Sequence, residues 1–401
     1  MRILQINLVY KYKSTGRTCY QLDKYFREMG HESMTAFGWG KKQKDAYRID
    51  TYFEYYFHNI LSRITGLEGR FSYFATKRLI NFIKKYNPDL IILHSLHGHY
   101  INQKLLFKYL KKANIKLVYH LHDCWPFTGK CTHYTKVSCS KWKTQCYSCP
   151  CKKEYPISWF FDFSKKLYIE KKSLYSKLPM LIIGNSHWTS EQASMSFLKN
   201  NIIKTVYNWI DIDDFCYSLD NSLYSKYNIP TNKFLIICVT SYWEETNPRF
   251  QDLIALSNML DNSMHVVMLG KTNTNIEYSN ITHIDFVSDT KEIAKLYSIC
   301  DCFVHLSTED SFGKVIAEAQ ACGTPAIVYD STACSEIVKN GETGFICEPR
   351  NLSKVYDCLK KVQAAGKTAF KDKCRNWIID EFSFSKNCSK FLSELERYNR
   401  E

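Results

Sequence analysis

Two carboxylates eight positions apart are the first candidates for chemistry in this sequence of 401 residues. Asp310 and Glu318 lie on either side of a predicted loop-to-helix junction that follows an apolar run at 302–306. Loops at the carboxyl ends of strands bind ligands in open α/β sheets, and the free N–H groups of a helix N-terminus suit phosphates or hydroxyls. If the pair stood alone, a capping carboxylate and a solvated Glu would explain it better. The junction itself contains Ser311, Phe312, Gly313 and Lys314.

His122 and Asp123 form a second candidate, because they follow an apolar run at 116–121. Side chains at such a strand end emerge at the ligand-binding edge of a parallel sheet. An imidazole and a carboxylate there can hydrogen-bond a substrate, although a histidine at a strand end is more often simply packed. The pair alone therefore leaves both interpretations open.

Cysteines are concentrated in one segment, where six of the seventeen fall between residues 124 and 151. Four thiolates on a compact polar loop can hold a tetrahedral ion in a reducing compartment, where disulfides are rare. We expect a structural zinc site here and no cofactor for catalysis. Free thiols packed in a loop, or a redox or disulfide role, are the alternatives. The four proposed ligands are Cys131, Cys139, Cys146 and Cys149.

The elements that must position these residues are those of an α/β protein. Apolar runs alternate with helical patterns, which indicates parallel sheets covered by helices, and the length calls for two domains. We place Rossmann-like domains at 1–207 and 208–380, facing across a cleft, with a last helix at 381–401 that can cross back to the first domain. The predicted strands are 3–9, 33–39, 89–95, 116–122, 180–186, 234–241, 265–270, 283–287, 302–306 and 325–329. The predicted helices are 17–29, 72–86, 102–113, 164–176, 249–260, 290–299, 314–322, 333–339, 351–365 and 384–398.

Charge divides unevenly along the chain, since residues 1–200 carry a formal charge of +20 and the rest −6. Solvated lysine faces are one explanation. We prefer contact with an anionic membrane surface, because basic residues alternate with aromatics in segment 53–86. No nucleic-acid-binding motif, secretory signal or membrane-spanning run is recognised, so a cytoplasmic, peripheral location is expected. The segment's cations include Arg63, Arg70, Lys77 and Arg78, and its aromatics include Phe53, Tyr55, Tyr56, Phe57, Phe71 and Phe74.

Segment 307–326, which reads STEDSFGKVIAEAQACGTPA, resembles the C-terminal signature of glycosyltransferase family 4. The resemblance continues through 335–345 and so spans nearly all of the second half. It implies the GT-B fold, with an acceptor-binding N-domain and a donor-binding C-domain. It also implies that Asp310 contacts the sugar of a nucleotide-sugar donor and that Glu318 binds the ribose, while the loop at 311–314 contacts the donor.

The same resemblance assigns roles in the first half. His122 and Asp123 stand where many family members place a histidine and an acid near the donor sugar, so we assign them to substrate positioning. A retaining transfer needs no strong protein base, because the departing diphosphate can take the acceptor proton and its stabilisation carries most of the rate. Gly16 resembles the glycine of a flexible loop beneath the diphosphate, although an ordinary turn is equally consistent.

One feature departs from the family pattern. Members usually carry a Lys-Gly pair after the first strand of the second domain, and its cation binds the donor diphosphate. Here the stretch 243–250 reads WEETNPRF and Arg249 is the nearest cation. Arg249 or Lys314 could substitute, the donor could bind weakly, or Arg249 could be a surface residue at a helix start.

The cysteine pattern, with stretches 93–98 and 185–188, resembles a subgroup of family 4 enzymes from bacterial capsule, O-antigen and colanic-acid-like pathways. The resemblance implies a retaining hexosyltransferase that uses a UDP- or GDP-sugar and a lipid-linked oligosaccharide acceptor. A degenerate sugar-nucleotide-binding or scaffolding homologue and an epimerase of the same fold are the rivals. The sequence leaves open the base, the sugar, the acceptor, the linkage and the oligomeric state.

Overall fold

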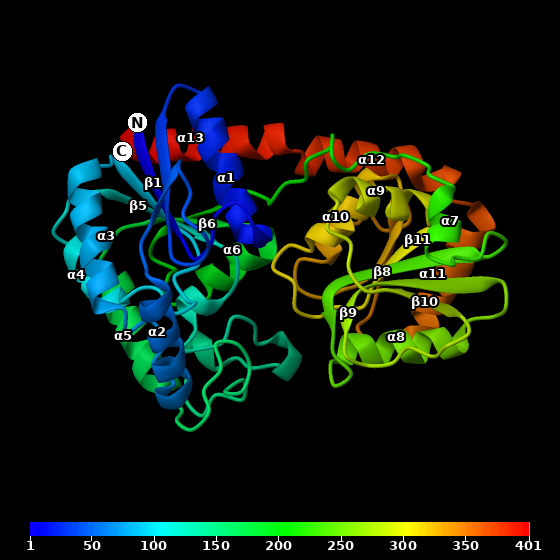
Figure 1. Cartoon of the computed structure of the whole chain (residues 1–401), viewed down its shortest axis with the longest axis horizontal. Helices are drawn as coiled ribbons and strands as arrows, with labels where there is room; N and C mark the ends of the chain where they lie inside the picture. Colours follow the sequence, from blue (N-terminus) through cyan, green and yellow to red (C-terminus); the bar gives the residue numbers. More distant parts are fainter. Residues whose placement is uncertain (401) are drawn as a thin grey trace. The chain divides into compact units, whose positions relative to one another are not determined.

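The computed structural model describes residues 1–400 and divides into two compact units. The first unit comprises Met1–Val206 together with the C-terminal residues from Cys388 onward, and the second comprises Tyr207–Asn387. Each unit contains one sheet with helices on both sides of its strands (Figure 1). No helix within residues 1–400 is long and apolar enough to cross a bilayer.

The first unit is built on a seven-stranded, all-parallel sheet in the order β3-β2-β1-β4-β5-β6-β7. The order reverses direction between β1 and β4, which is the switch point where doubly wound sheets bind ligands. The strands are β1 (Arg2–Asn7), β2 (Glu32–Phe37), β3 (Ala46–Arg48), β4 (Leu90–Leu93), β5 (Lys116–Leu121), β6 (Leu181–Gly184) and β7 (Ile202–Thr205). The helices are α1 (Lys13–Glu28), α2 (Tyr52–Thr65), α3 (Tyr73–Tyr86), α4 (Gln103–Leu110), α5 (Ser164–Tyr175), α6 (His187–Ser194) and α13 (Phe384–Arg400).

Strand β5 shows how the two faces of this sheet are used. Successive side chains of a strand point to opposite faces. Tyr119 and Leu121 join the large apolar core that includes residues of α3 and α4. His120 points the other way, where its ring lies 5.0 Å from that of Phe391 on α13. The last helix thus completes the cover of the face that carries the histidines.

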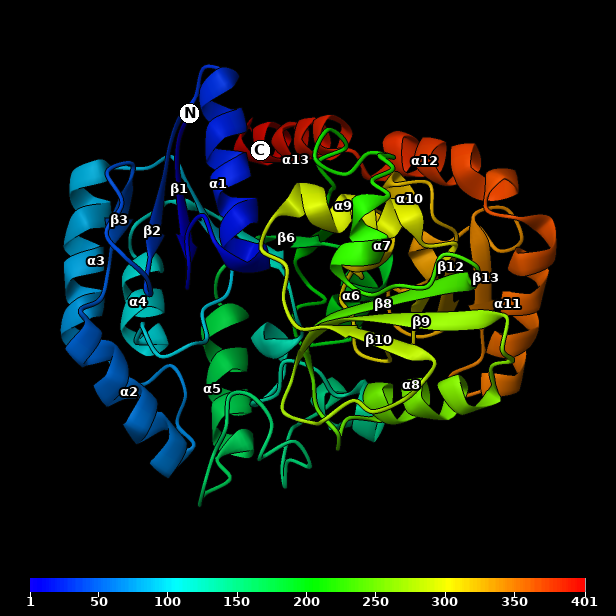
Figure 2. The same cartoon turned by 45° about the vertical axis from the view of Figure 1, so that its right-hand side comes forward.

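The second unit repeats the plan with a six-stranded parallel sheet in the order β10-β9-β8-β11-β12-β13. Figure 2 shows its strands β8, β9 and β10 side by side. The switch point lies between β8 and β11. The strands are β8 (Phe234–Trp243), β9 (Met264–Thr272), β10 (Ile281–Ile284), β11 (Cys302–His305), β12 (Ala326–Tyr329) and β13 (Gly344–Cys347). The helices are α7 (Ser222–Lys226), α8 (Pro248–Met259), α9 (Thr290–Ile299), α10 (Lys314–Ala321), α11 (Leu352–Ala365) and α12 (Thr368–Phe382).

Side-chain caps fix many of the helix starts. Thr51 and Glu54 form a reciprocal capping box at α2, and Asn102 accepts from Leu105 at α4. Asn247 caps α8 just before Pro248, which suits the first helical position. These caps satisfy N–H groups that a helix leaves unpaired.

Several elements differ from the sequence-based expectation. The predicted helix at 333–339 is a short 3-10 turn over Ser335–Ile337. Strands β3, β7 and β13 were not predicted, and all three lie at a sheet edge. Edge strands are half-covered, so their apolar runs are short and weak. Helices α2, α6, α7 and α12 were also missed; α2 buries only His58 and Ser62 and therefore lacks a clear apolar stripe.

Candidate functional site

The loop between β11 and α10 presents Asp310 at the switch point of the second sheet. Gly313 starts α10 with a φ of +83°, a left-handed conformation that side chains rarely adopt. A Cβ at this position would lie 2.7 Å from Cδ1 of Ile316. The glycine is therefore required for the tight turn that brings the loop onto the helix N-terminus.

Three side chains surround the carboxylate of Asp310. Nε2 of His305 lies 2.8 Å from Oδ2 of Asp310, and the guanidinium of Arg249 lies 3.3 Å from the same oxygen. The thiol of Cys334 donates to it more weakly at 3.8 Å. The second carboxylate oxygen has no partner in these contacts, so it is the atom with which Asp310 can accept a ligand hydroxyl.

The environment keeps Asp310 ionised. Burial opposes ionisation, but the interactions with His305 and the charge of Arg249 outweigh it and lower the pKa of Asp310 below its ordinary value. Burial lowers the pKa of His305, with Asp310 opposing, so its ring is neutral near pH 7 and Nε2–H donates. A charged acceptor of this kind binds a hydroxyl more strongly than a neutral one does.

Arg249, the predicted diphosphate-binding cation, is held by the Asp310 loop. One end of its guanidinium donates to Oδ2 of Asp310 and to Oγ of Ser307, and the other donates to Thr240 at 3.3 Å. Arg249 is the second residue of α8, and its side chain is half-buried. Its contacts make it the counter-ion of Asp310.

The remaining predicted donor-binding residues differ in how exposed their side chains are. The side chain of Phe312 is buried against Tyr207 and Phe382, so only its backbone could meet a ligand. Glu318 is half-buried on the second turn of α10. Ser311 and Lys314 are also half-buried. Sequence reasoning missed His305, although its position five residues before Asp310 at a strand end was a usable signal.

In the first unit, Asp123 pairs with His97 rather than orienting His122. Its Oδ2 lies 2.8 Å from Nε2 of His97, and its Oδ1 accepts from the backbone of Trp125. Nδ1 of His97 is in turn 3.1 Å from the hydroxyl of Tyr155. Burial raises the pKa of Asp123, but His97 outweighs it and lowers that pKa overall. Asp123, His97 and Tyr155 thus form a chain of contacts.

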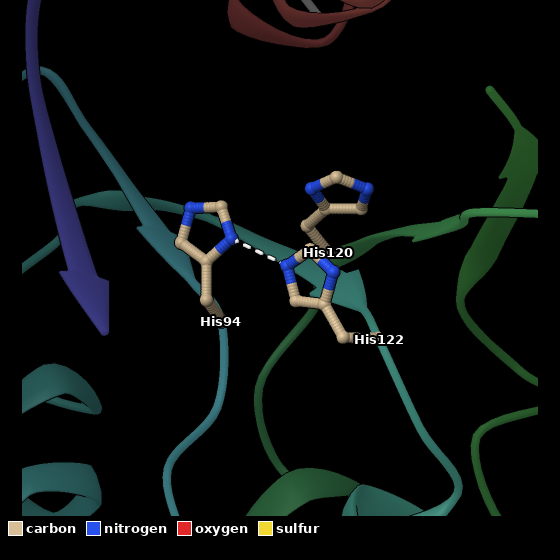
Figure 3. A group of neighbouring side chains, drawn as sticks. All are labelled: His94, His120 and His122. Carbon is tan, nitrogen blue, oxygen red and sulfur yellow. Dashed lines mark hydrogen bonds between the residues drawn. The ribbon is translucent and has the colours of Figure 1, made fainter. Parts of the chain in front are cut away.

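His122 is oriented instead by a chain of hydrogen bonds that starts at Gln5. Nε2 of Gln5 donates to the carbonyl of Cys19 and to Asp23, so Oε1 of Gln5 must accept. Nε2 of His94 therefore donates to that oxygen at 3.0 Å, which leaves Nδ1 of His94 as an acceptor. Nε2 of His122 lies 2.9 Å from this Nδ1 and must be its donor (Figure 3).

The chain fixes the tautomer of His122 because both rings are neutral. Burial lowers the pKa of His122 to about 4 and lowers that of His94 well below its ordinary value. With the proton of His122 on Nε2, its Nδ1 is a lone-pair acceptor. The imidazole can therefore accept a hydrogen bond from a hydroxyl at Nδ1.

Gly16 does not lie in a flexible loop, as the sequence comparison implied, but in the first turn of α1. Its carbonyl accepts from the backbone of Lys11 at 3.0 Å. A Cβ there would lie 3.1 Å from Val9 and 3.2 Å from the backbone of Tyr10. The residue thus allows close packing of the turn after β1.

Two of the four predicted zinc ligands, Cys131 and Cys149, interact with each other and with Cys151 in the cysteine loop. Interactions with Cys131 and Cys151 lower the pKa of Cys149 to about 3, and interactions with Cys149 and Cys151 raise the pKa of Cys131. Sγ of Cys146 accepts from the backbone of Gly129 at 3.2 Å. Cys139 is half-buried. Sequence reasoning missed Cys151, although the spacing Cys149-Pro-Cys151 was visible.

Two family descriptions match the chain. The family "Glycosyltransferase Family 4" matches residues 15–214, and "Glycosyl transferases group 1" matches residues 223–376. The two matches follow one another and leave only short segments unmatched.

Individual proteins support the same assignment. The chain is 23% identical over 373 residues to WcaC of Escherichia coli K12, named as a colanic acid biosynthesis glycosyl transferase, covering 88% of this chain and 89% of that protein. It is 24% identical over 202 residues to an E. coli UDP-Gal:alpha-D-GlcNAc-diphosphoundecaprenol alpha-1,3-galactosyltransferase, covering 47% and 52%. Anabaena Alr3699/HepE in complex with UDP superposes with a TM-score of 0.67 at 16% identity, covering 99% of this chain and all of that one. The chain belongs to glycosyltransferase family 4, and its two parallel-sheet domains have the GT-B fold.

Proposed function

We propose that the protein transfers a sugar, with retention, from a nucleotide diphosphate sugar to a lipid-linked glycan during bacterial surface polysaccharide synthesis. The observation that carries the proposal is the ionised Asp310 in the loop that leads into the N-terminus of α10. The named activities of the E. coli relatives and the UDP bound to the Anabaena protein support this choice of donor and acceptor.

On this proposal the second unit holds the donor. Asp310 accepts hydroxyls of the sugar, the loop of residues 311–314 offers N–H groups to the diphosphate, and Glu318 accepts the ribose hydroxyls. Arg249 keeps Asp310 ionised and adds positive charge near the leaving group. Without the family's Lys-Gly pair, stabilisation of the diphosphate then depends on Arg249, Lys314 and backbone N–H groups.

His122 binds substrate through Nδ1 and does not act as an obligatory base. Its lowered pKa keeps it neutral across the physiological range, so it can accept a hydroxyl proton in a hydrogen bond. The departing diphosphate takes the acceptor proton, and the rate depends on stabilising that leaving group.

Part of the first unit is suited to a membrane surface. The side chains of Phe53, Phe57 and Ile60 on α2 are exposed, Phe53 by 78%. The end of α2 meets a second aromatic segment, since the backbone of Trp159 donates to the carbonyl of Arg63 at 2.7 Å. In that segment Trp159, Phe160 and Phe161 are also exposed. Aromatics beside cations favour the headgroup layer, where a lipid-linked acceptor is found.

Two of the four predicted membrane cations are already paired within the protein. Arg70 forms an ion pair with Glu170, and Arg78 lies 2.5 Å from Glu54. Arg63 and Lys77 instead contact the aromatic rings of Trp159 and Tyr73. Arg63 and Lys77 therefore carry most of the proposed attraction of this segment to anionic lipid.

The cysteine loop fits a structural zinc ion by its donor set. The neighbouring thiols of Cys131 and Cys151 lower the pKa of Cys149, which favours the thiolate that zinc binds. Zinc would be held by four sulfurs from among Cys131, Cys139, Cys146 and Cys149, with Cys151 as a fifth candidate. The zinc ion would stabilise the folded conformation of the loop.

The test of the proposed function is a donor screen followed by product analysis. Saturation-transfer NMR with UDP- and GDP-sugars should identify one donor, and that donor with a polyprenyl-diphosphate-linked glycan should yield a product whose new anomeric linkage matches the donor's. Donor binding without any product supports the degenerate homologue. A converted free sugar nucleotide, formed without acceptor, supports the epimerase.

A further inference from the structure

Three histidines cluster at the candidate site of the first unit, and one of them is His122 itself. His94 follows β4, and His120 and His122 lie at the end of β5 (Figure 3). One ring nitrogen from each lies within 4.8 Å of the others. His94 is 1% exposed and His120 is fully buried. Imidazole nitrogens are the ligands that zinc, copper, nickel and cobalt share.

His120 is the unexplained member of this cluster. Within residues 1–400, neither of its ring nitrogens has a hydrogen-bond partner. Its neighbours are the rings of His122 at 4.3 Å, Phe391 at 5.0 Å and His94 at 5.4 Å. Burial of a polar ring without a partner costs free energy, whereas a bound ion would satisfy one nitrogen.

His94 already has the tautomer that a metal ligand needs. Its Nε2–H donates to Gln5, so the lone pair of Nδ1 points toward His122. Metal-binding histidines are usually fixed in this way by a second-shell acceptor on the other ring nitrogen. Gln5 is itself held by Cys19 and Asp23.

We propose that His94, His120 and His122 form a binding site for a divalent transition-metal ion, and zinc is the ion that we expect. Three imidazole nitrogens leave a fourth, tetrahedral position for water. The site is separate from the cysteine loop, and it uses the face of β5 that α13 covers.

Metal binding and the hydrogen bond between His94 and His122 exclude each other. Without metal, Nε2–H of His122 donates to His94 and Nδ1 accepts. To bind metal through Nε2, His122 must carry its proton on Nδ1, which then becomes a donor. This consequence rests on the proposed function of His122: the ion should inhibit sugar transfer, because the ring could no longer accept a hydroxyl.

The direct test measures zinc and cobalt binding by the full-length protein after dialysis against a chelator, with no donor or acceptor present. Wild type should bind one equivalent more than His120→Phe, which keeps a ring of similar size beside Phe391. The affinity of the variant for that ion should fall at least about 100-fold. Loss of a residue that only supports a metal ligand costs up to about 100-fold, and His120 is proposed as a ligand itself. His265→Phe is the matched control, because His265 is also a buried strand histidine with an unpartnered Nδ1.

Cobalt distinguishes this site from the cysteine loop. Thiolate ligands give an intense near-ultraviolet charge-transfer band, while an all-histidine site gives only weak visible bands. The visible bands should disappear in His120→Phe and the charge-transfer band, if present, should remain. Equal stoichiometry and equal spectra in wild type and a folded His120→Phe would overturn the proposal.

A second measurement needs no variant and so covers a failure of His120→Phe to fold. In wild type labelled with ¹⁵N-histidine, zinc should shift three coupled imidazole spin systems and move the His122 proton from Nε2 to Nδ1. Imidazole signals that do not change at saturating zinc contradict the site. Inhibition by zinc in wild type but not in His120→Phe then reports the link to transfer separately from binding.

Discussion

The Asp310 loop and the His122 strand end are both half-buried polar sites on parallel sheets, but one is charged and the other is neutral. Asp310 is an anion with a cation beside it, and its main partners come from β11 and α8. His122 belongs to a neutral chain that runs through His94 to Gln5. A charged site depends on its counter-ion, whereas a neutral one depends on which nitrogen carries each proton. The two should therefore respond differently to pH and to isosteric substitution.

Mild acid should give the largest difference between the two units. Burial lowers the pKa of His58 and His122 to about 4 and lowers those of His94 and His120 well below their ordinary value, and all four lie in the first unit. The unfolded chain binds protons at these histidines near pH 6.5, so stability falls as pH drops from about 6.5 toward 4. Each histidine contributes up to about 1.4 kcal/mol per pH unit.

Other groups modify this expectation only in part. Asp50, whose pKa burial raises to about 8, holds a proton in the folded state and stabilises the first unit as pH falls. In the second unit, burial lowers the pKa of His265 to about 4, and Asp310 loses its contribution only below its ordinary pKa near 3.8. Hydrogen exchange at pH 5 should show opening of β5 before β11. Simultaneous opening of both strands would contradict the expectation that mild acid destabilises the first unit before the second.

Asp310→Asn tests the charged site. The amide can still accept from His305, but Arg249 loses its counter-ion and the sugar loses a charged acceptor. We expect kcat/KM to fall about 10²- to 10³-fold, as when one charge-stabilising group is removed from an active site. Steady-state kinetics measures this, with Glu309→Gln as the control at the neighbouring position. Wild-type activity in Asp310→Asn would remove Asp310 from the site.

The contrast also explains what could be predicted from the sequence. Asp310, the turn at Gly313 and the start of α10 lie within one contiguous string, 307–326, so a single segment identified them, whereas the partners His305 and Arg249 lie outside it. The neutral chain joins Gln5, His94 and His122 from three strands, and no spacing along the sequence links them. The central strands were predicted from their apolar runs. The three missed strands lie at sheet edges, where burial on one side leaves a weaker pattern.

The charge asymmetry of the two halves can be tested through Arg63 and Lys77, which form no ion pair with an acidic residue within residues 1–400. Arg63→Glu with Lys77→Glu should weaken binding to anionic vesicles about tenfold or more, since each cation near such a surface contributes about 1 kcal/mol. Lys111→Glu with Lys112→Glu changes the net charge equally at exposed positions elsewhere in the first unit. Vesicle sedimentation at low and high salt provides the measurement. Equal loss in both double variants would mean that net charge alone, and not this surface, attracts the protein.

The smallest expected effect tests the neutral chain. His94→Phe keeps a ring between β1 and β5 but removes the acceptor of His122 and the donor to Gln5. His122 can then carry its proton on either nitrogen, so only part of the population accepts a hydroxyl at Nδ1. We expect kcat to fall about tenfold, the scale of one lost hydrogen bond, with the KM for the donor unchanged. His94→Asn retains an amide oxygen that can accept from His122 and should recover part of the loss. If His94 had only a structural role, both variants would lose thermal stability and His94→Asn would not recover kcat. A wild-type kcat in a folded His94→Phe would show that the tautomer of His122 does not matter for transfer.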